Sequence, residues 1–207
     1  MRLLVASVLF LAACCAPSLG NPHDLETATK SVVQVDAGPG SYGSGFVIRS
    51  TKIADNAYAI LILTAKHVTD GAPEGWPKVL GVEATVVANH LEFDTSLVSV
   101  VLDQPMPVAT MRLNQEVEVG ENLYGMGFSG GQGELWVTHG VASNRDRGAS
   151  AVPGDSGGPI VDANGHVVGI IVSIDVGSNG FSRDYIYHHC AFVPVVDLVE
   201  WLEMVVF

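Results

Sequence analysis

Short apolar segments follow one another along most of this chain, each interrupted by glycine, proline, asparagine or aspartate. They recur at intervals of roughly ten residues, a spacing typical of short β-strands joined by turns. The segments with this pattern are 31–35, 45–48, 57–64, 84–88, 97–102, 122–128, 134–141, 159–162, 167–173 and 186–193. No heptads, internal repeats or low-complexity tracts accompany them, so the pattern predicts an all-β sandwich or barrel.

The end of the chain has a different periodicity. Directly after Pro194, apolar residues recur at intervals of three and four positions, as on one face of an α-helix. These residues are Val195, Leu198, Val199, Leu202 and Val206. We therefore expect a C-terminal α-helix packed on the β-structure. A loose midpoint at 113–120 divides the strand pattern into two halves of similar size.

The first 20 residues resemble a secretory signal peptide, with one arginine before an eleven-residue apolar run at 3–13. This run is shorter than the roughly 20 residues that a membrane-spanning helix needs, and it lacks the polar face of a surface helix. Two cleavage sites compete. The residues 11–14 resemble a lipobox, which would leave Cys14 as a lipid anchor, whereas Ser18 and Gly20 suit ordinary signal peptidase. Both predict an exported protein, whether periplasmic, secreted or anchored as a lipoprotein.

Composition excludes two broad classes of protein. Hydrophobic residues make up 48% of the 207 positions and charged residues 15%, which is enough apolar material to exclude wholesale disorder. The net charge of −12 and the absence of a basic stripe argue against a nucleic-acid partner. Of the three cysteines only Cys190 lies deep in the chain, so we expect no disulfide framework, and nothing favours a bond between Cys15 and Cys190.

The strongest chemical signal is the segment 153–159, Pro-Gly-Asp-Ser-Gly-Gly-Pro. A nucleophilic serine needs a tight, accessible turn, and the glycines around Ser156 allow one. In such a turn the N–H groups of Gly154 and Ser156 can converge as an oxyanion hole. Asp155 is expected to turn inward and hold the loop through an ion pair or hydrogen bonds.

A nucleophilic serine also needs a base and a carboxylate that orients that base. His67 follows the apolar strand 57–64, and Asp94 opens the strong strand pattern 94–100. An isolated histidine at a strand end is more often structural, and an isolated aspartate there is more often a turn residue. Together with Ser156, in the order His, Asp, Ser, they predict a catalytic triad.

These residues stand within motifs that resemble those of the trypsin-like serine peptidases, particularly the HtrA-type and other short bacterial or phage members. The resemblance covers about residues 28–207. The motifs that carry it are GSGFVI at 43–48, LTAKHV at 63–68, DTSLV at 94–98, THGVAS at 138–143, GDSGGPI at 154–160, GHVVGI at 165–170 and AFVP at 191–194.

The resemblance implies a chymotrypsin-like fold of two six-stranded antiparallel β-barrels with a C-terminal α-helix. The barrels would span 28–115 and 116–207 and form one peptidase domain. Its implied activity is hydrolysis of polypeptide substrates without a cofactor, in a cleft between the barrels. His67 would act as the general base, Asp94 would orient it, and Ser156 would attack the scissile carbonyl.

The chain departs from both relatives in informative ways. HtrA proteins carry PDZ domains after the peptidase, and we expect none here because the sequence ends just past the predicted helix. Asp155 is the residue found in trypsin, where many HtrA members have asparagine. Trypsin's disulfides and the new N-terminus that activates it have no counterpart, so Asp155 needs another partner and activation by cleavage is in doubt.

Family analogy also suggests the substrate pocket. Its floor would be Ser150, one wall would come from Val172 and Ser173, and another from Cys190. None of these residues is acidic, so the pocket is expected to take a small or medium apolar residue rather than Lys or Arg. Alternatively, His188 or His189 could admit an acidic residue.

Other interpretations have less support. His166, His188, His189 and Cys190 could suggest a metal site, but the strand places neighbours on opposite faces and no zinc spacing is present, so we expect no metal. The glycines at 125–133 lack the lysine of a phosphate-binding loop. Two rival functions remain open: a pseudoprotease that binds without turnover, and a protease that cuts only itself or one partner.

Overall fold

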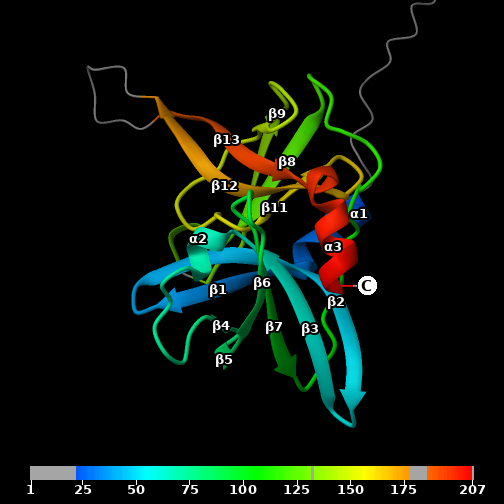
Figure 1. Ribbon diagram of the computed structural model, residues 1–207. Coiled ribbons are helices and arrows are strands. Elements are labelled where there is room, and N and C mark those ends of the chain that lie inside the picture. Colours follow the sequence, from blue (N-terminus) through cyan, green and yellow to red (C-terminus); the bar gives the residue numbers. More distant parts are fainter. Residues whose placement is uncertain (1–21, 132, 178–185, 207) are drawn as a thin grey trace, which may run out of the picture.

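The computed structural model describes residues 22–131, 133–177 and 186–206, and the side chains of these except 22–24, 174–177 and 186–189. Within these residues the strands form two curled antiparallel sheets, one after the other along the chain (Figure 1). The first sheet has seven strands in the order β5-β4-β1-β2-β3-β7-β6, and the second has six in the order β10-β13-β12-β11-β8-β9.

The first sheet contains β1 (Val32–Gly38), β2 (Ser41–Ala54), β3 (Ala57–Thr64), β4 (Lys78–Val79), β5 (Val82–Glu83), β6 (Thr85–Asn89) and β7 (Ser96–Leu102). The second contains β8 (Asn122–Gly127), β9 (Trp136–Val141), β10 (Arg147–Gly148), β11 (Pro159–Asp162), β12 (Val167–Gly177) and β13 (Ile186–Pro194). All ten apolar segments singled out in the sequence form strands, so the all-β prediction is confirmed.

The prediction of six strands in each half is wrong for the first half. The first sheet has seven strands, and two of them, β4 and β5, form a short hairpin beside β1, where Val35 pairs with Val79. Each of these strands has only two residues, as does β10. A two-residue strand is too short to show alternation, so the apolar pattern could not predict it.

The predicted C-terminal helix is confirmed, although its first turn is a 3₁₀ turn, η2 (Val195–Leu198), which continues into α3 (Val199–Val206). Two further helices, α1 (Pro22–Ser31) and α2 (Lys66–Thr69), were not predicted, nor was the 3₁₀ turn η1 (Ser129–Gly131). None of the helices in the described residues is long and apolar enough to cross a membrane. The predicted signal peptide and Cys14 lie outside the described residues.

Three apolar clusters form the core. One lies within the first sheet around Ile60 and Ile62, and another within the second sheet around Leu123 and Ile171. The third cluster joins the two sheets to the C-terminal helix, because Phe46, Leu63, Leu97, Met126, Ile170 and Leu202 all belong to it. The two sheets and α3 are therefore packed as one unit, with the helix lying across both (Figure 1).

The segment that connects the two sheets is fastened to the second one. Arg112 in this segment pairs with Glu121, before β8, and with the buried Asp162 at the end of β11. Its backbone N–H also donates to the Val167 carbonyl at 2.8 Å. The predicted boundary between residues 115 and 116 falls inside this connection and remains a prediction.

Candidate active site

His67 and Asp94 contact each other directly. The His67 ring nitrogen Nδ1 lies 2.5 Å from Asp94 Oδ2. The His67 backbone N–H also donates to Asp94 Oδ1 at 2.8 Å. Since an ionised carboxylate can only accept, Nδ1 carries the shared proton, and the other ring nitrogen, Nε2, is left free to accept one.

Strand register brings these two residues together. Thr64 at the end of β3 pairs with Ser96 at the start of β7. His67 comes three positions after Thr64, in the single turn of α2, and Asp94 comes two positions before Ser96. Ala65 at the N-cap of α2 offers no side-chain hydrogen bond, so Asp94 takes over the role of cap by accepting the His67 N–H.

The pairing changes the proton affinity of both groups. The hydrogen bond to Asp94 raises the pKa of His67 above its ordinary value, even though partial burial acts in the opposite direction. Partial burial alone would raise the pKa of Asp94, but the hydrogen bonds from the His67 ring and backbone outweigh it and lower that pKa. Both shifts favour an imidazolium beside an ionised carboxylate.

Ser156 lies half-buried on the loop between Ala149 and β11, which rests against the first sheet. The Ser44 N–H on β2 donates to the Ser156 carbonyl at 2.7 Å. Ser44 Oγ donates to the Gly154 carbonyl at 2.8 Å and accepts the Phe128 N–H at 2.8 Å. One buried serine of the first sheet therefore holds both the serine loop and the end of β8.

Two glycines let the serine loop approach α2 closely. A Cβ atom on Gly157 would lie 2.2 Å from the Ser44 carbonyl oxygen and 2.7 Å from the Ala65 nitrogen. A Cβ atom on Gly43 would meet both the Val68 side chain and the Ser156 carbonyl oxygen, at 2.6 and 2.9 Å. The backbone of Ser156 and the helical turn of His67 thus lie against the same strand. The Ser156 hydroxyl itself forms no hydrogen bond with any of the described residues.

The chain turns sharply just before Ser156. The Asp155 N–H donates to the Val152 carbonyl at 3.0 Å, and Gly154 has a φ of +104°. A positive φ at the third residue, after a proline, is the arrangement of a type II turn. The Pro153 carbonyl accepts the Gly130 N–H at 3.0 Å. Because the C=O and N–H of a trans peptide point in opposite directions, the Gly154 N–H faces away from Gly130.

Asp155 is buried and finds its partners within the second half of the chain. Its Oδ1 accepts the Ser129 hydroxyl at 2.6 Å, and its Oδ2 accepts the Val152 N–H at 2.8 Å. Burial raises the pKa of Asp155, and these two hydrogen bonds only partly offset that effect. Of the alternatives expected from the sequence, hydrogen bonds rather than an ion pair hold this loop.

The four residues expected to form the substrate pocket have different surroundings. The Ser150 carbonyl accepts the Thr138 hydroxyl. Cys190 is fully buried, its thiol donates to the Gly148 carbonyl at 2.9 Å, and burial raises its pKa to about 12. Val172 is half-buried and lines a cavity of about 400 Å³, while Ser173 is exposed. The side chains of His188 and His189 lie outside the described residues.

Ser44 and Gly130 have structural roles that the sequence did not predict. In the sequence Ser44 is only one residue of the motif at 43–48. The feature that could have indicated its role is its place between two glycines, which allow another segment to approach the strand closely. Gly130 belongs to the glycine-rich stretch 125–133, whose end folds against the serine loop. In the described part of the chain, no three or more His, Cys, Asp or Glu side chains are grouped as metal ligands would be.

Comparison with known proteins places this geometry in a family. Residues 43–170 match the family described as the trypsin-like peptidase domain, which is more than half of the chain. The chain belongs to this family. The matched residues include Ser44, His67, Asp94 and Ser156, whose contacts are described above.

Individual relatives agree with this assignment. A probable periplasmic serine endoprotease DegP-like protein of Hahella chejuensis is 30% identical over 157 residues, which is 68% of this chain and 31% of that protein. The magnetosome formation protease MamE of Paramagnetospirillum magneticum is 23% identical over 200 residues, covering 88% of this chain and 26% of that protein. The chain thus spans about a third or less of the length of these curated relatives.

Two solved structures share the fold. The serine endoprotease from Yersinia pestis superimposes with a TM-score of 0.64 at 21% identity, covering 88% of this chain and 65% of that one. The HtrA-type protease AlgW, solved with a tripeptide, gives a TM-score of 0.65 at 21% identity, covering 88% of this chain and 62% of that one. The chymotrypsin-like fold implied by the sequence motifs is therefore confirmed.

Proposed function

We propose that this chain is a serine endopeptidase that hydrolyses peptide bonds through Ser156, His67 and Asp94. The observation that carries the proposal is the double contact between His67 and Asp94 beside the loop of Ser156. It leaves Nε2 as the one ring nitrogen able to accept a proton, which is what a serine hydroxyl needs in order to become a nucleophile.

The reaction would proceed in two halves. Ser156 Oγ attacks the scissile carbonyl carbon while His67 Nε2 takes its proton, and the resulting imidazolium is stabilised by Asp94. His67 then gives that proton to the departing amine, and the C–N bond breaks to leave an acyl-enzyme. A water molecule, deprotonated in turn by His67, attacks the ester carbonyl. His67 then returns that proton to Ser156 Oγ as the C–O bond breaks, which releases the acid and free Ser156.

The oxyanion of each tetrahedral intermediate needs N–H donors that are already oriented. The Gly154 and Ser156 N–H groups are proposed to supply them. Support comes from the turn at 152–155, where the Pro153 carbonyl is held by Gly130 and the Gly154 N–H is turned the other way. Loss of one such donor typically costs about 2.7–4 kcal/mol of transition-state stabilisation.

Labelling with a fluorophosphonate probe tests the proposal. The full chain should be labelled, whereas Ser156→Ala should not be labelled and His67→Ala should be labelled far more slowly. Circular dichroism on all three proteins controls for folding. A folded wild-type protein that resists labelling and does not digest an unfolded protein substrate would contradict the proposal and support the pseudoprotease alternative.

A protease that cuts only itself or one partner is the second alternative. It predicts self-cleavage during expression that disappears in Ser156→Ala, together with no digestion of unrelated unfolded proteins. A digest of a peptide library separates the cases and reports the preferred residue at the cut. Ser150, Val172, Ser173 and Cys190 are uncharged, so we propose a small or medium apolar residue there.

We further propose that the protein acts outside the cytoplasm on polypeptide substrates. Support comes from the signal-like residues 1–20 and from the DegP-like relative, whose name describes it as periplasmic. Cell fractionation after expression of the full gene tests this. Metabolic labelling with a fatty-acid analogue, compared with Cys14→Ser, distinguishes a lipoprotein from a freely secreted form.

A further inference from the structure

A long groove runs along the C-terminal helix and reaches Phe93, the residue before Asp94. It consists of two cavities, of about 590 and 400 Å³, which share Phe93 and Asp197 in their walls. The larger lies between the loop 90–93 and the helical segment of η2 and α3. The smaller lies between Phe93, the loop at 145–146 and the strands β12 and β13. We call the two together the helix groove.

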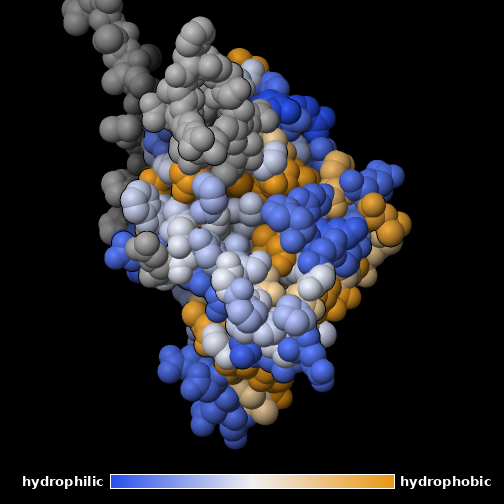
Figure 2. All heavy atoms as spheres, turned by 90° about the vertical axis from the view of Figure 1, so that its left-hand side faces the viewer, coloured by the Kyte–Doolittle hydropathy of each residue, from blue (hydrophilic) through white to orange (hydrophobic). Residues whose placement is uncertain are grey.

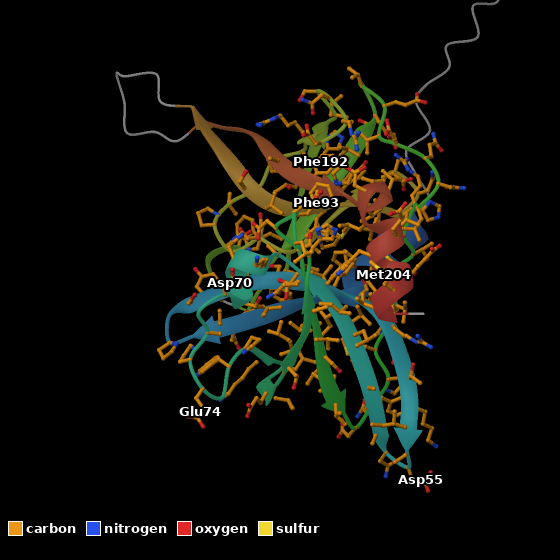
Figure 3. The ribbon with its side chains drawn as sticks, viewed as in Figure 1. Asp55, Asp70, Glu74, Phe93, Phe192 and Met204 are labelled. Carbon is orange, nitrogen blue, oxygen red and sulfur yellow. The ribbon has the colours of Figure 1, made fainter. Side chains whose placement is uncertain are left out.

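The inner end of the helix groove adjoins the catalytic residues. Phe93 directly precedes Asp94. Val172 lines the smaller cavity and directly follows Ile171, whose carbonyl accepts the Gly157 N–H at 2.7 Å beside the serine. Figure 3 shows Phe93 near the middle of the molecule, where the sheets meet, and Met204 on α3 toward the outside. The groove thus begins at chain neighbours of the candidate site, Phe93 and Val172, and ends at an outer face; His67, Asp94 and Ser156 themselves do not line it.

Its walls present apolar side chains to solvent. Leu91 is 96% exposed and Met204 is 77% exposed, and both line the larger cavity with Trp201. Leu91 and Met204 come from different elements, a loop of the first sheet and the C-terminal helix. Exposed apolar side chains that meet across a concavity are typical of a binding site.

The loop that forms one wall is held in place by His90. The His90 nitrogen Nδ1 accepts the N–H groups of Glu92 and Phe93, each at 3.1 Å. Its ring lies 4.9 Å from the Phe93 ring and 5.4 Å from the Trp201 ring. These contacts connect the loop to α3, so the groove exists before any ligand binds, and ordering it costs little.

The outer part of the groove is acidic. Glu92 on the loop and Glu200 on α3 are both exposed and both line the larger cavity. Neither carboxylate forms an ion pair with another described residue. Asp197, in contrast, is neutralised by Arg145, whose guanidinium lies 2.6 Å from both carboxylate oxygens. Two uncompensated negative charges therefore flank the apolar residues Leu91 and Met204.

We propose that the helix groove binds a segment of the substrate that flanks the scissile bond, and that it selects an apolar side chain accompanied by lysine or arginine. This inference rests on the proposed peptidase function. The apolar residue would pack between Leu91 and Met204, and the basic residue would pair with Glu92 or Glu200. A second copy of this chain is a poor occupant, because it also carries a net charge of −12.

Binding to the Ser156→Ala variant tests the groove without any need for turnover. Two fluorescent peptides share one core taken from the library digest, or a mixed apolar core if no peptide is cleaved. One is extended by Leu-Lys-Lys and the other by Leu-Glu-Glu. The extension is attached to the N-terminal side of the core in one pair of peptides and to the C-terminal side in a second pair. Fluorescence anisotropy should give an affinity about tenfold higher for the lysine peptide, and the difference should shrink as salt is added.

Variants of the groove residues show which side chains cause the preference for the lysine peptide. Glu92→Gln with Glu200→Gln should remove the preference for lysine, while Leu91→Ser with Met204→Ser should weaken both peptides. Glu203→Gln is the matched control, since Glu203 lies exposed on α3 but does not line the groove. Equal affinities for the two peptides, or a preference that survives the double Gln variant, would overturn the proposal.

The two proposals can fail separately. If the wild type is labelled by the fluorophosphonate but the extensions change neither affinity nor kcat/KM, the peptidase stands and the groove proposal is wrong. If the wild type is not labelled but the Ser156→Ala variant still prefers the lysine peptide, the groove proposal stands and the chain is a binding module.

Discussion

At the scale of single residues, the protonation of His67 connects structure with activity. Only neutral imidazole can take the Ser156 proton, so activity should rise with pH as His67 is deprotonated. The hydrogen bond to Asp94 raises the pKa of His67, so the acid limb of the kcat/KM profile should lie above the ordinary imidazole value of 6.5.

Asp94→Asn tests this connection. The acid limb should move to lower pH, because the charge and hydrogen bond that raise the pKa of His67 are removed, and kcat near neutral pH should fall by roughly 10⁴-fold. The measurement is kcat/KM as a function of pH on a peptide identified by the library digest. An acid limb that stays in place would mean that Asp94 does not control the protonation of His67.

The same pair makes stability depend on pH. The raised pKa of His67 stabilises the fold fully below pH 6.5, and this contribution is lost as pH rises through the folded-state pKa. The lowered pKa of Asp94 stabilises the fold above pH 3.8, and this contribution is lost as pH falls through the folded-state pKa. In urea titrations, Asp94→Asn should therefore destabilise most between these two values and less in alkaline solution.

At the scale of elements, the connection between the sheets depends on a largely buried ionic cluster of Arg112, Glu121 and Asp162. Arg112 and Asp162 have side chains only 12% and 3% exposed, and their nearest polar atoms are 3.1 Å apart. Asp162 Oδ1 also accepts the N–H groups of Asn164 and His166, each at 2.9 Å, which shapes the turn between β11 and β12. The cluster thus fixes the connecting segment to that turn.

Replacing Arg112 should be costly, because it removes the guanidinium from the buried Asp162 carboxylate, whose other possible cation, His166, lies 3.6 Å away and is charged only when protonated. Arg112→Met is expected to lower the free energy of unfolding by about 3–5 kcal/mol. Arg145→Met is the matched control: its side chain is 48% exposed, so loss of its pair with Asp197 should cost below about 1 kcal/mol. Chemical denaturation measures both, and similar losses would show that the Arg112 cluster is not a structural connection.

At the scale of the whole molecule, the candidate active site belongs to neither sheet alone. His67 and Asp94 lie at the ends of strands of the first sheet, and Ser156 lies on a loop of the second. Figure 2 shows the side that lies on the left in Figure 1, where a pale surface of intermediate hydropathy lies between hydrophilic and hydrophobic regions. The hydrogen bonds of Ser44 are the polar links that align the two halves across this junction.

Ser44→Ala tests this alignment. The Gly154 carbonyl and the Phe128 N–H lose their partner, at about 1–3 kcal/mol for each unsatisfied group, and the serine loop should shift. We expect kcat to fall at least tenfold with little change in KM. Ser31→Ala is the matched control, because this buried hydroxyl donates to the Ala28 carbonyl at 2.7 Å and forms no hydrogen bond with the described residues of the serine loop. A fall of kcat in both variants would indicate a general loss of stability instead.

Local patterns in the sequence determined the strands, the C-terminal helix and the three candidate catalytic residues. Alternation, turn residues and helical spacing each depend on neighbours a few positions apart, so a single chain displays them. The two-residue strands were missed because they are too short to show alternation. The helix α1 was missed because its mostly polar residues show little apolar periodicity, although Pro22 at its start and Lys30 in its last turn are helix signals. The roles of His67, Asp94 and Ser156 remain predictions from motif and geometry together.

Only the tertiary structure decided how these parts meet. The register that pairs Thr64 with Ser96 brings His67 to Asp94, and the hydrogen bond from Ser44 to Gly154 joins residues 110 positions apart. The partners of Asp155 and the helix groove likewise arise from segments that only folding brings together. Such contacts follow from packing of the whole core, because no short window of sequence contains both partners.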